Sequence, residues 1–198
     1  MPDYSQYGQQ RILTEHFGDR KGFLIDVGAG DGINLSNSRA LLEQGWRGVL
    51  VEPHRELFKE LVKNTIGVVD AVPINVAFAD GNGAAKLHLS PPGADTDHTL
   101  MIRDHWDSYE VRVCRLDSLF PFKIDLLLVD AEGLDYAVLL GVDWTVNRPE
   151  VVVAEGVMNG EPVNCFEITE LMKANGYGPL GEGKFLHGID LFFKLLDD

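Results

Sequence analysis

The chain has 198 residues, of which 45% are hydrophobic and 24% are charged. This composition is that of an ordinary folded domain, and it excludes a disordered chain, a collagen and a long coiled coil. Seventeen Lys and Arg residues against 31 Asp and Glu give a formal net charge of −14. Such a surface repels a phosphate backbone, so we expect no nucleic acid partner.

The length favours a single domain over residues 1–198. No apolar run approaches the roughly 20 residues that cross a bilayer, and the first residues lack the basic and apolar stretches of a signal peptide. We therefore expect a cytoplasmic protein with no membrane partner. Cys114 and Cys165 have no CxxC spacing and stand in apolar segments, which predicts reduced thiols in the core.

Short apolar runs alternate with segments of helical period, which is typical of βαβ units, so the predicted fold class is α/β. The first predicted strand, Phe23–Val27, leads into a glycine turn at residues 28–32 and a helix over residues 36–44. A second strand at residues 49–51 ends at Glu52 and is followed by an amphipathic helix. A third strand is predicted at residues 72–79.

The second half begins with a turn at residues 80–83 and a hairpin strand near residues 86–89. Residues 90–108 have no clear period and form a candidate lid. The most apolar strand, at residues 124–129, should be central in the sheet and ends at Asp130. The remaining predictions are a strand at 111–116, a helix cap at Asp117 and Ser118, a helix at 135–140, a strand at 151–154 that ends at Glu155, a helix at 166–174 and a last strand at 191–196.

In an open α/β sheet the ligand binds outside the carboxyl ends of the strands. The residues there are the glycine turn, Glu52, Asp130 with Glu132, and Glu155. A glycine turn allows close approach of a ligand, and an acid at the end of the next strand can accept hydrogen bonds from ribose hydroxyls. Together they predict a nucleoside ligand.

The spacing of the glycines disfavours a dinucleotide. Ile33 stands where the dinucleotide fingerprint has its third glycine. Asp26 and Asp31 beside the turn would repel a pyrophosphate and would tolerate a zwitterion or a cation, which favours S-adenosylmethionine. No tyrosine is followed by Lys four residues later, and no GxxxxGK[ST] motif is present.

Two segments carry a family resemblance. Residues 23–32, FLIDVGAGDG, resemble motif I of class I S-adenosylmethionine-dependent methyltransferases. Residues 124–135, IDLLLVDAEGLD, resemble the signature of the FkbM family. Further similarities are the sequences SQYGQ at 5–9, SNS at 36–38, Glu52-Pro53, NVA at 75–77 and LDSL at 116–119.

This resemblance implies a Rossmann-like class I methyltransferase sheet. The sheet would be seven-stranded and mostly parallel with an antiparallel last strand, and helices would cover both faces. The implied activity is methylation of an oxygen, often a hydroxyl of a sugar or natural product, with S-adenosylmethionine as the cofactor. The chain departs from the family at Leu128, Asp135 and Gln10, where Lys, Glu and an acid are common.

The resemblance also implies roles for individual residues. Gly28, Gly30 and Gly32 would pass under the cofactor, while Glu52 would hold the ribose. Asp26 and Asn34 would lie near the cofactor's amino acid end, and Asn75 to Ala77 would flank the adenine. Asp130 would also belong to the cofactor-binding residues.

Transfer to a hydroxyl requires a proton acceptor, and a hydroxyl is too weak an acid for an unaided carboxylate of pKa about 4. Asp130, Glu132 and Glu155 are the candidate catalytic acids, and Asp130 with Glu155 could hold Mg²⁺. Alternatively, Asp130 and Glu132 cap the following helix and shape the pocket without a metal. The candidate histidine bases are His98, His105 and His187, and Trp106 and Tyr109 could stack on a substrate.

The leading hypothesis is therefore an O-methyltransferase that acts on a small-molecule or carbohydrate hydroxyl. One alternative is an NAD-linked or nucleotide-sugar oxidoreductase on a related sheet. The other is a catalytically silent module that binds the cofactor.

Overall fold

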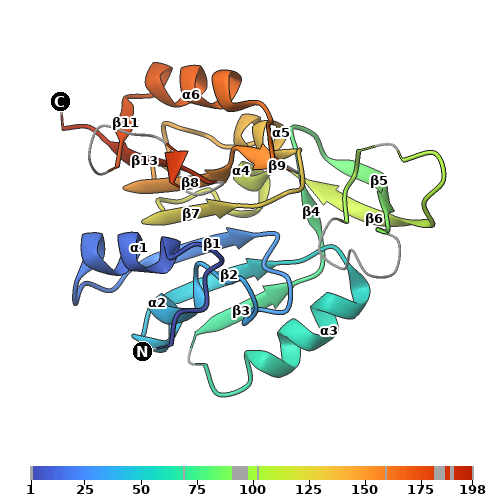
Figure 1. The fold of residues 1–198 in the computed structure, drawn as a ribbon, viewed down its shortest axis with the longest axis horizontal. Coiled ribbons are helices and arrows are strands. Elements are labelled where there is room, and N and C mark those ends of the chain that lie inside the picture. The colour runs from blue at the N-terminus through green and yellow to red at the C-terminus, as the bar shows by residue number, and fades with distance from the viewer. Residues whose placement is uncertain are drawn as a thin grey trace.

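The computed structural model describes residues 2–68, 70–90, 98–101, 103–158, 160–180, 186–187 and 190–197. Its main sheet has the strand order β11-β13-β8-β7-β1-β2-β3, with β12 paired to β13 (Figure 1). The strands of this sheet are β1 (Phe23–Val27), β2 (Arg47–Val51), β3 (Ala71–Ile74), β7 (Leu126–Val129), β8 (Val151–Glu155), β11 (Tyr177–Pro179), β12 (Leu186–His187) and β13 (Asp190–Leu195).

The direction of the strands agrees with the expected sheet. β1 pairs in parallel with β2 and β7, and the pairs β2–β3 and β7–β8 are also parallel. β13 runs antiparallel to β8 and to β11. The predicted antiparallel last strand and the central place of β7 are thus confirmed. β7 is buried along its whole length, since both faces of the sheet are covered there.

Helices cover both faces of the sheet. Successive strand residues point to opposite faces, so each strand contributes side chains to both helix layers. One core cluster joins Leu24 and Leu126 to α1, α2 and α3. The other joins Ile25 and Leu127 to α4, α5 and α6. The helices are α1 (Gln9–Phe17), α2 (Arg39–Glu43), α3 (Arg55–Asn64), α4 (Leu116–Leu119), α5 (Asp135–Leu140) and α6 (Cys165–Ala174).

Two smaller sheets extend the core. β4 (Ala77–Phe78), β5 (Gly83–His88) and β6 (Ser108–Cys114) form a three-stranded sheet that projects to the right in Figure 1. β9 (Val157–Met158) pairs with β10 (Glu161–Pro162). The predicted strand at residues 72–79 is therefore wrong as one element, because the chain leaves the main sheet at Asn75 and β4 pairs with β6 instead.

Two further predictions need correction. The helix expected at residues 36–44 contains only Arg39–Glu43. Ser36 accepts a hydrogen bond from the backbone N–H of Arg39, and Ser38 donates to Asp26, so these serines lie outside the helix. Asp117 and Ser118 do not cap α4 but lie within it, and Asp117 forms an ion pair with Arg115.

The sequence patterns did not reveal α1 and β11. α1 has a polar surface, and only four of its residues are buried. Both cysteines are free thiols, and Cys114 is buried as predicted, whereas Cys165 is only partly buried. Within the described ranges, no helix is long and apolar enough to cross a bilayer.

Candidate functional site

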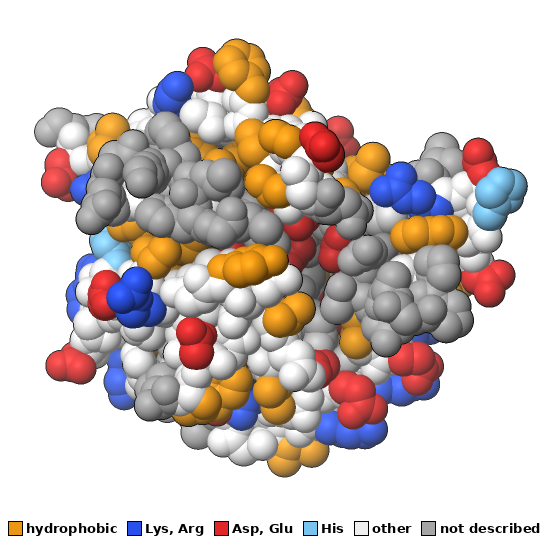
Figure 2. Space-filling model, in the orientation of Figure 1, with side chains coloured by type: hydrophobic (Ala, Val, Ile, Leu, Met, Phe, Trp, Pro, Cys, Tyr) orange, Lys and Arg blue, Asp and Glu red, His pale blue; other side chains and the backbone are white. Residues whose placement is uncertain are grey.

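A cavity of about 310 Å³ lies at the carboxyl ends of β1, β2 and β7. The chain order reverses between β1 and β7, so this is the position where open α/β sheets bind ligands. Figure 2 shows acidic atoms on the floor of a hollow near the centre of this face, with hydrophobic side chains on its rim. Of the predicted site residues, those that line the cavity are Asp26, Gly28, Gly30, Asn34, Glu52, Ala77, Asp130 and Glu132, whereas Gly32, Asn75 and Glu155 do not line it.

The glycine turn after β1 is built for close backbone contact. Gly28 has φ +81°, and a Cβ there would lie 1.7 Å from the carbonyl oxygen of Asp130. Gly30 faces open space, with no atom within 4 Å of an added Cβ. Gly32 has a different role, because a Cβ there would meet Leu61 of α3 at 2.5 Å. The turn therefore exposes bare backbone at Gly30 and packs tightly at Gly28 and Gly32.

Glu52 follows β2 and is 5% exposed. One carboxylate oxygen accepts from the Gly30 backbone N–H at 2.9 Å, and the other accepts from that of His54 at 2.7 Å. Burial raises the pKa of Glu52 to about 7, although these two hydrogen bonds oppose the rise. A carboxylate has about four acceptor positions, so Glu52 can still accept from two hydroxyl groups.

Asp26 and Asn34 lie on either side of the turn. Asp26 is buried and accepts a hydrogen bond from Ser38, while burial raises its pKa to about 6. Asn34 is exposed, and its backbone N–H donates to Asp31 at 2.8 Å. Asp31 therefore organises the turn, and Asn34 lies at the rim of the cavity.

Ala77 lines the cavity together with Phe78, Val76 and Leu57, which gives this end an apolar wall. Asn75 does not share this position. Its side chain donates to the backbone carbonyls of Glu52 and Pro53 at 2.7 and 3.1 Å, so it holds the strand ends together.

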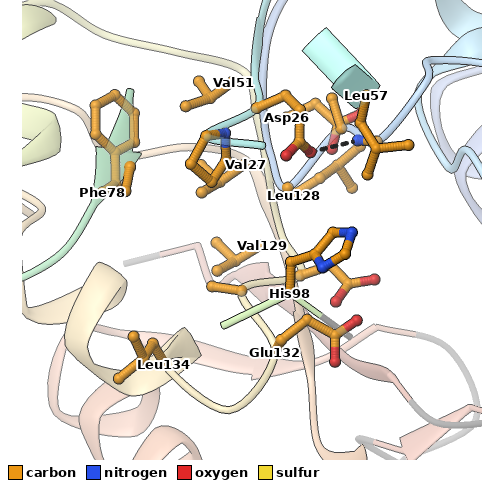
Figure 3. Close-up of a pocket in the computed structure, with 18 of the residues that line it drawn as sticks. Asp26, Val27, Val51, Leu57, Phe78, His98, Leu128, Val129, Glu132 and Leu134 are labelled. Atoms are coloured by element: carbon orange, nitrogen blue, oxygen red, sulfur yellow. Dashed lines mark hydrogen bonds between the residues drawn. The ribbon is translucent and has the colours of Figure 1, made fainter. Parts of the chain in front are cut away.

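The segment after β7 brings two acids to the cavity. Asp130 is exposed, and Glu132 is partly buried with φ +51°. The carbonyl oxygen of Glu132 accepts from the Thr99 hydroxyl at 2.9 Å, which ties part of the predicted lid to this turn. A non-glycine residue in the left-handed region carries strain, and such residues cluster at functional sites. In the view of Figure 3, His98 and Glu132 project from one side of the pocket and Asp26 from the other.

Glu155 lies beside this turn, on β8. It is 8% exposed, and its Oε2 has no hydrogen-bond partner in the part of the chain that the structure describes. Burial and the charges of Asp130 and Asp135 raise its pKa well above the usual range. Asp135 is also buried, which raises its pKa to about 8. Among the described side chains, no group of three or more His, Cys, Asp or Glu residues is arranged to hold a metal ion.

Of the candidate histidine bases, only His98 lines the cavity. Its Nδ1 accepts from the Ser90 backbone N–H at 3.0 Å, so the proton of the neutral ring is on Nε2. His98 also stacks on His54 with ring centroids 3.9 Å apart. His105 does not line the described cavity. The side chain of His187 lies outside the described residues. The lid residues 91–97 and 102 also lie outside them.

Of the two aromatic candidates, neither lines the described cavity. Tyr109 accepts from the Arg55 backbone N–H at 2.8 Å and lies under the Arg55 guanidinium at 4.2 Å. Trp106 lies beside Arg103 at 5.7 Å. Both side chains therefore contact neighbouring arginines.

Sequence reasoning missed Asp190, the first residue of β13, which is 4% exposed and lines the cavity. Because β13 is antiparallel, its first residue lies opposite Glu155, at the carboxyl end of β8. Gln9 donates to Asp190 at 2.8 Å, and Asn37 also forms a side-chain hydrogen bond with it. Asp190 precedes its strand, and because this strand is antiparallel, its start lies at the edge of the sheet where the parallel strands end.

Comparisons with solved structures identify the fold. A ribosomal protein L11 methylase from Lactobacillus delbrueckii subsp. bulgaricus has a TM-score of 0.58 and 13% identity, with 96% of this chain and 77% of that chain covered. A precorrin-6y C5,15-methyltransferase from Geobacter metallireducens GS-15 has a TM-score of 0.51 and 13% identity, with 93% and 84% covered. The chain thus has the class I methyltransferase fold.

The family is shown by a sequence model. The model of the methyltransferase FkbM domain matches residues 26–179, which is most of the chain. The chain therefore belongs to the FkbM methyltransferase family and is an S-adenosylmethionine-dependent methyltransferase. The structure of a methyltransferase FkbM from Methylobacillus flagellatus KT has a TM-score of 0.53 and 11% identity. The match covers 77% of this chain but only 37% of that chain. A search of curated proteins found no significant match.

Proposed function

We propose that this protein transfers the methyl group of S-adenosylmethionine to a hydroxyl oxygen of a small molecule or carbohydrate. The observation that carries the proposal is the cavity wall, which offers acceptor oxygens to a ligand rich in donors. Six acids line it, and among the described lining residues there is no Lys or Arg. Hydroxyl groups can donate to these oxygens, whereas a phosphorylated acceptor would be repelled.

The residues present fit the cofactor. Glu52 retains acceptor positions for two ribose hydroxyls, and the bare backbone at Gly30 permits close approach. The apolar wall near Ala77 and Phe78 suits a purine ring. When bound, the cofactor supplies an activated methyl group on a cationic sulfonium, and the acidic lining stabilises that positive charge.

The proposed chemistry of the chain is to position the acceptor and to take its proton. Asp130 and Glu132 are the acids after β7 that line the cavity, and they can hold the hydroxyl near the methyl group. Asp130 raises the pKa values of Asp135, Glu155 and Asp190. This repulsion is mutual, so the cluster is a better proton acceptor than an isolated carboxylate. His98 is a donor through Nε2 in this arrangement.

We propose that the transfer does not require Mg²⁺. Asp130 and Glu155 are the expected ligands, and no third donor of the described part of the chain completes a site with them. Glu155 favours its protonated form, which does not bind metals. Transfer should therefore persist after exhaustive dialysis against EDTA, with no response to added Mg²⁺. Loss of transfer that Mg²⁺ restores would contradict this proposal.

The decisive experiment has two stages. Calorimetric titration with S-adenosylmethionine, S-adenosylhomocysteine and NADH should show binding of the first two only. S-adenosylmethionine labelled with ¹³C in the methyl group is then incubated with the protein and a panel of neutral and amino sugars. The carbon chemical shift of the product separates O-, N- and C-methyl groups. Binding of NADH alone would favour an oxidoreductase, and cofactor binding without any transfer would favour a silent module.

A further inference from the structure

The turn after β7 has two consecutive residues in the left-handed region. Glu132 has φ +51° and Gly133 has φ +90°. This region is unfavourable for a residue with a Cβ, so the conformation of Glu132 persists only where its surroundings hold it. The direction of a side chain follows from the backbone conformation of its own residue. The contacts that hold the backbone of Glu132 therefore also determine where its carboxylate lies in the cavity that it lines.

Thr99 holds this turn from another part of the chain. Its hydroxyl donates to the carbonyl oxygen of Glu132 at 2.9 Å and accepts from the backbone N–H of Met101 at 3.0 Å. A hydroxyl has one proton, and the Met101 N–H occupies one of its acceptor positions, so that proton is directed at Glu132. Thr99 is 2% exposed. Because water has little access to this hydroxyl, its loss would be costly to the groups that it bonds.

Thr99 is itself fixed to the three-stranded sheet. Its backbone N–H donates to the carbonyl oxygen of His88 at 3.1 Å, and its carbonyl oxygen accepts from the His88 N–H at 2.8 Å. His88 is the last residue of β5. Thr99 therefore connects a strand of this sheet to the turn after β7.

The residue before Thr99 contacts the end of β2. His98 stacks on His54 with ring centroids 3.9 Å apart, and the His54 backbone N–H donates to Glu52. In Figure 3, His98 lies on the same side of the pocket as Glu132. Residues 98 and 99 thus connect the acid after β2 to the acid after β7, and one short segment sets their relative position.

Other contacts pack the same turn. Nδ2 of Asn164 donates to the carbonyl oxygen of Gly133 at 3.3 Å. A Cβ at Gly133 would lie 2.8 Å from Sδ of Met101 and 2.8 Å from Cε of Met158. These contacts restrict Gly133, whereas the Thr99 hydroxyl acts on Glu132 directly.

We propose that Thr99 is a positioning residue for methyl transfer: its hydroxyl fixes the left-handed conformation of Glu132 and thereby places the Glu132 carboxylate at the methyl acceptor. This inference rests on the proposed function, which assigns Glu132 to the acceptor. Thr99 itself does not line the described cavity. A displacement of about 1 Å can slow a reaction by about a hundredfold, so a hydroxyl behind the cavity wall can control the rate.

The test removes the hydroxyl and keeps the shape of the side chain. Thr99→Val replaces the hydroxyl by a methyl group, and Thr99→Ser retains the hydroxyl. Thr65→Val is the matched control, because Thr65 is also buried and its hydroxyl donates to the backbone carbonyl oxygen of Leu61 at 2.8 Å, at the end of α3. Thermal unfolding checks that all variants are folded.

Each protein is saturated with S-adenosylmethionine labelled with ¹³C in the methyl group. C–H···O contacts with nearby oxygen atoms change the NMR signal of the bound methyl group. We expect Thr99→Val to move this signal by more than its linewidth and to slow transfer to the sugars that the wild type methylates by about tenfold or more. Its affinity for S-adenosylhomocysteine should stay within about threefold of the wild type. Thr99→Ser and Thr65→Val should resemble the wild type in all three measurements.

Four results would overturn the inference. One is a wild-type methyl signal and transfer rate in Thr99→Val, and the signal alone decides this point if the wild type methylates none of the sugars. Another is a defect in Thr99→Ser equal to that of Thr99→Val, which would mean that the hydroxyl is not responsible. The third is an equal defect in Thr65→Val, which would reflect general destabilisation. The fourth is a loss of S-adenosylhomocysteine affinity in Thr99→Val, which would assign the effect to the cofactor.

Failure of the wild type to bind S-adenosylmethionine would reject the proposed function, and the inference with it. Binding by the wild type together with any of the four results would reject the inference alone. The two failures are therefore distinguishable.

Discussion

In the β1–β2 half of the cavity, the carboxylate of Glu52 accepts a backbone hydrogen bond on each oxygen. In the β8–β13 half, Asp190 lines the cavity and is hydrogen-bonded to two side-chain amides, and the buried Glu155 beside it, outside the cavity wall, has an oxygen without a partner in the described chain. The first half is organised before any ligand arrives, since its donors belong to the backbone. The second half contains acceptors that a ligand can satisfy. A preorganised half suits a cofactor that is always the same, and a half with acceptor groups for a ligand suits the methyl acceptor.

The largest expected effect is on stability and comes from a change in the backbone of the β1–β2 half. Gly28→Ala should lower the free energy of unfolding by about 3–5 kcal/mol. The added Cβ would lie 1.7 Å from the Asp130 carbonyl oxygen, at a residue with φ +81°. Urea denaturation measures the loss.

Gly67→Ala is the matched control for this change. Gly67 has nearly the same dihedral, φ +86°, but no atom lies within 4 Å of an added Cβ. Its cost should be only the backbone strain, about 1 kcal/mol. Equal losses in the two variants would mean that the turn can move away from Asp130, and the first half would then be less rigid than its hydrogen bonds indicate.

The next effect concerns affinity. Glu52→Gln should weaken S-adenosylhomocysteine binding by about 1–3 kcal/mol, roughly tenfold to a hundredfold, because the amide must turn its donor toward the Gly30 or His54 backbone N–H. Calorimetry gives the affinity. Glu60→Gln is the control, since Glu60 is exposed on α3 and pairs only with Lys63 among the described residues. Equal affinity of wild type and Glu52→Gln would remove Glu52 from the cofactor site.

The two halves also differ in how far the sequence predicts them. β1 and α5 have the predicted bounds, and Glu52 and Asp130 stand at strand ends as expected. These are local features: a buried apolar run, a glycine turn and an acid after a strand. Each can be recognised within about ten residues.

The other half depends on contacts between distant segments. Gln9 and Asp190 are 181 positions apart in the sequence, and the polar surface of α1 gives no sign that Gln9 is buried. Asp190 precedes an apolar run, which looks like an ordinary strand start unless the strand is known to be antiparallel. The split of residues 72–79 into β3 and β4 likewise depends on pairing with β6. Tertiary pairing, not local pattern, determines these features.

The acid cluster predicts a pH dependence of stability. Glu52 and Asp190 have pKa values raised to about 7, and Asp135 to about 8, mainly by burial. The folded state therefore binds more protons than the unfolded state above the ordinary carboxyl pKa, and stability falls as pH rises toward the folded pKa.

His54 acts in the opposite direction at lower pH. Burial lowers its pKa from 6.5 to about 4, so its contribution to the free energy of unfolding rises with pH up to 6.5 and is then constant. The window for the test is thus from 6.5 to about 8. There the free energy of unfolding should fall by about 1 kcal/mol per pH unit or more. Urea denaturation across this range measures the slope, and Asp190→Asn should reduce it. A flat or rising profile would contradict uncompensated burial of these acids.

The smallest expected effect concerns Asn75 and tests where the β1–β2 half of the cavity ends. Asn75 was expected to flank the adenine, but its side chain donates to the carbonyls of Glu52 and Pro53 and does not line the cavity. Asn75→Ala should therefore lower the free energy of unfolding by about 1 kcal/mol and change S-adenosylhomocysteine affinity by less than about threefold. Asn82→Ala, which removes hydrogen bonds to Arg115 and Ser118, should give a similar stability loss with no change in affinity. If Asn75→Ala weakened binding as much as Glu52→Gln, Asn75 would contact the cofactor, and the boundary of the preorganised half would extend to β4.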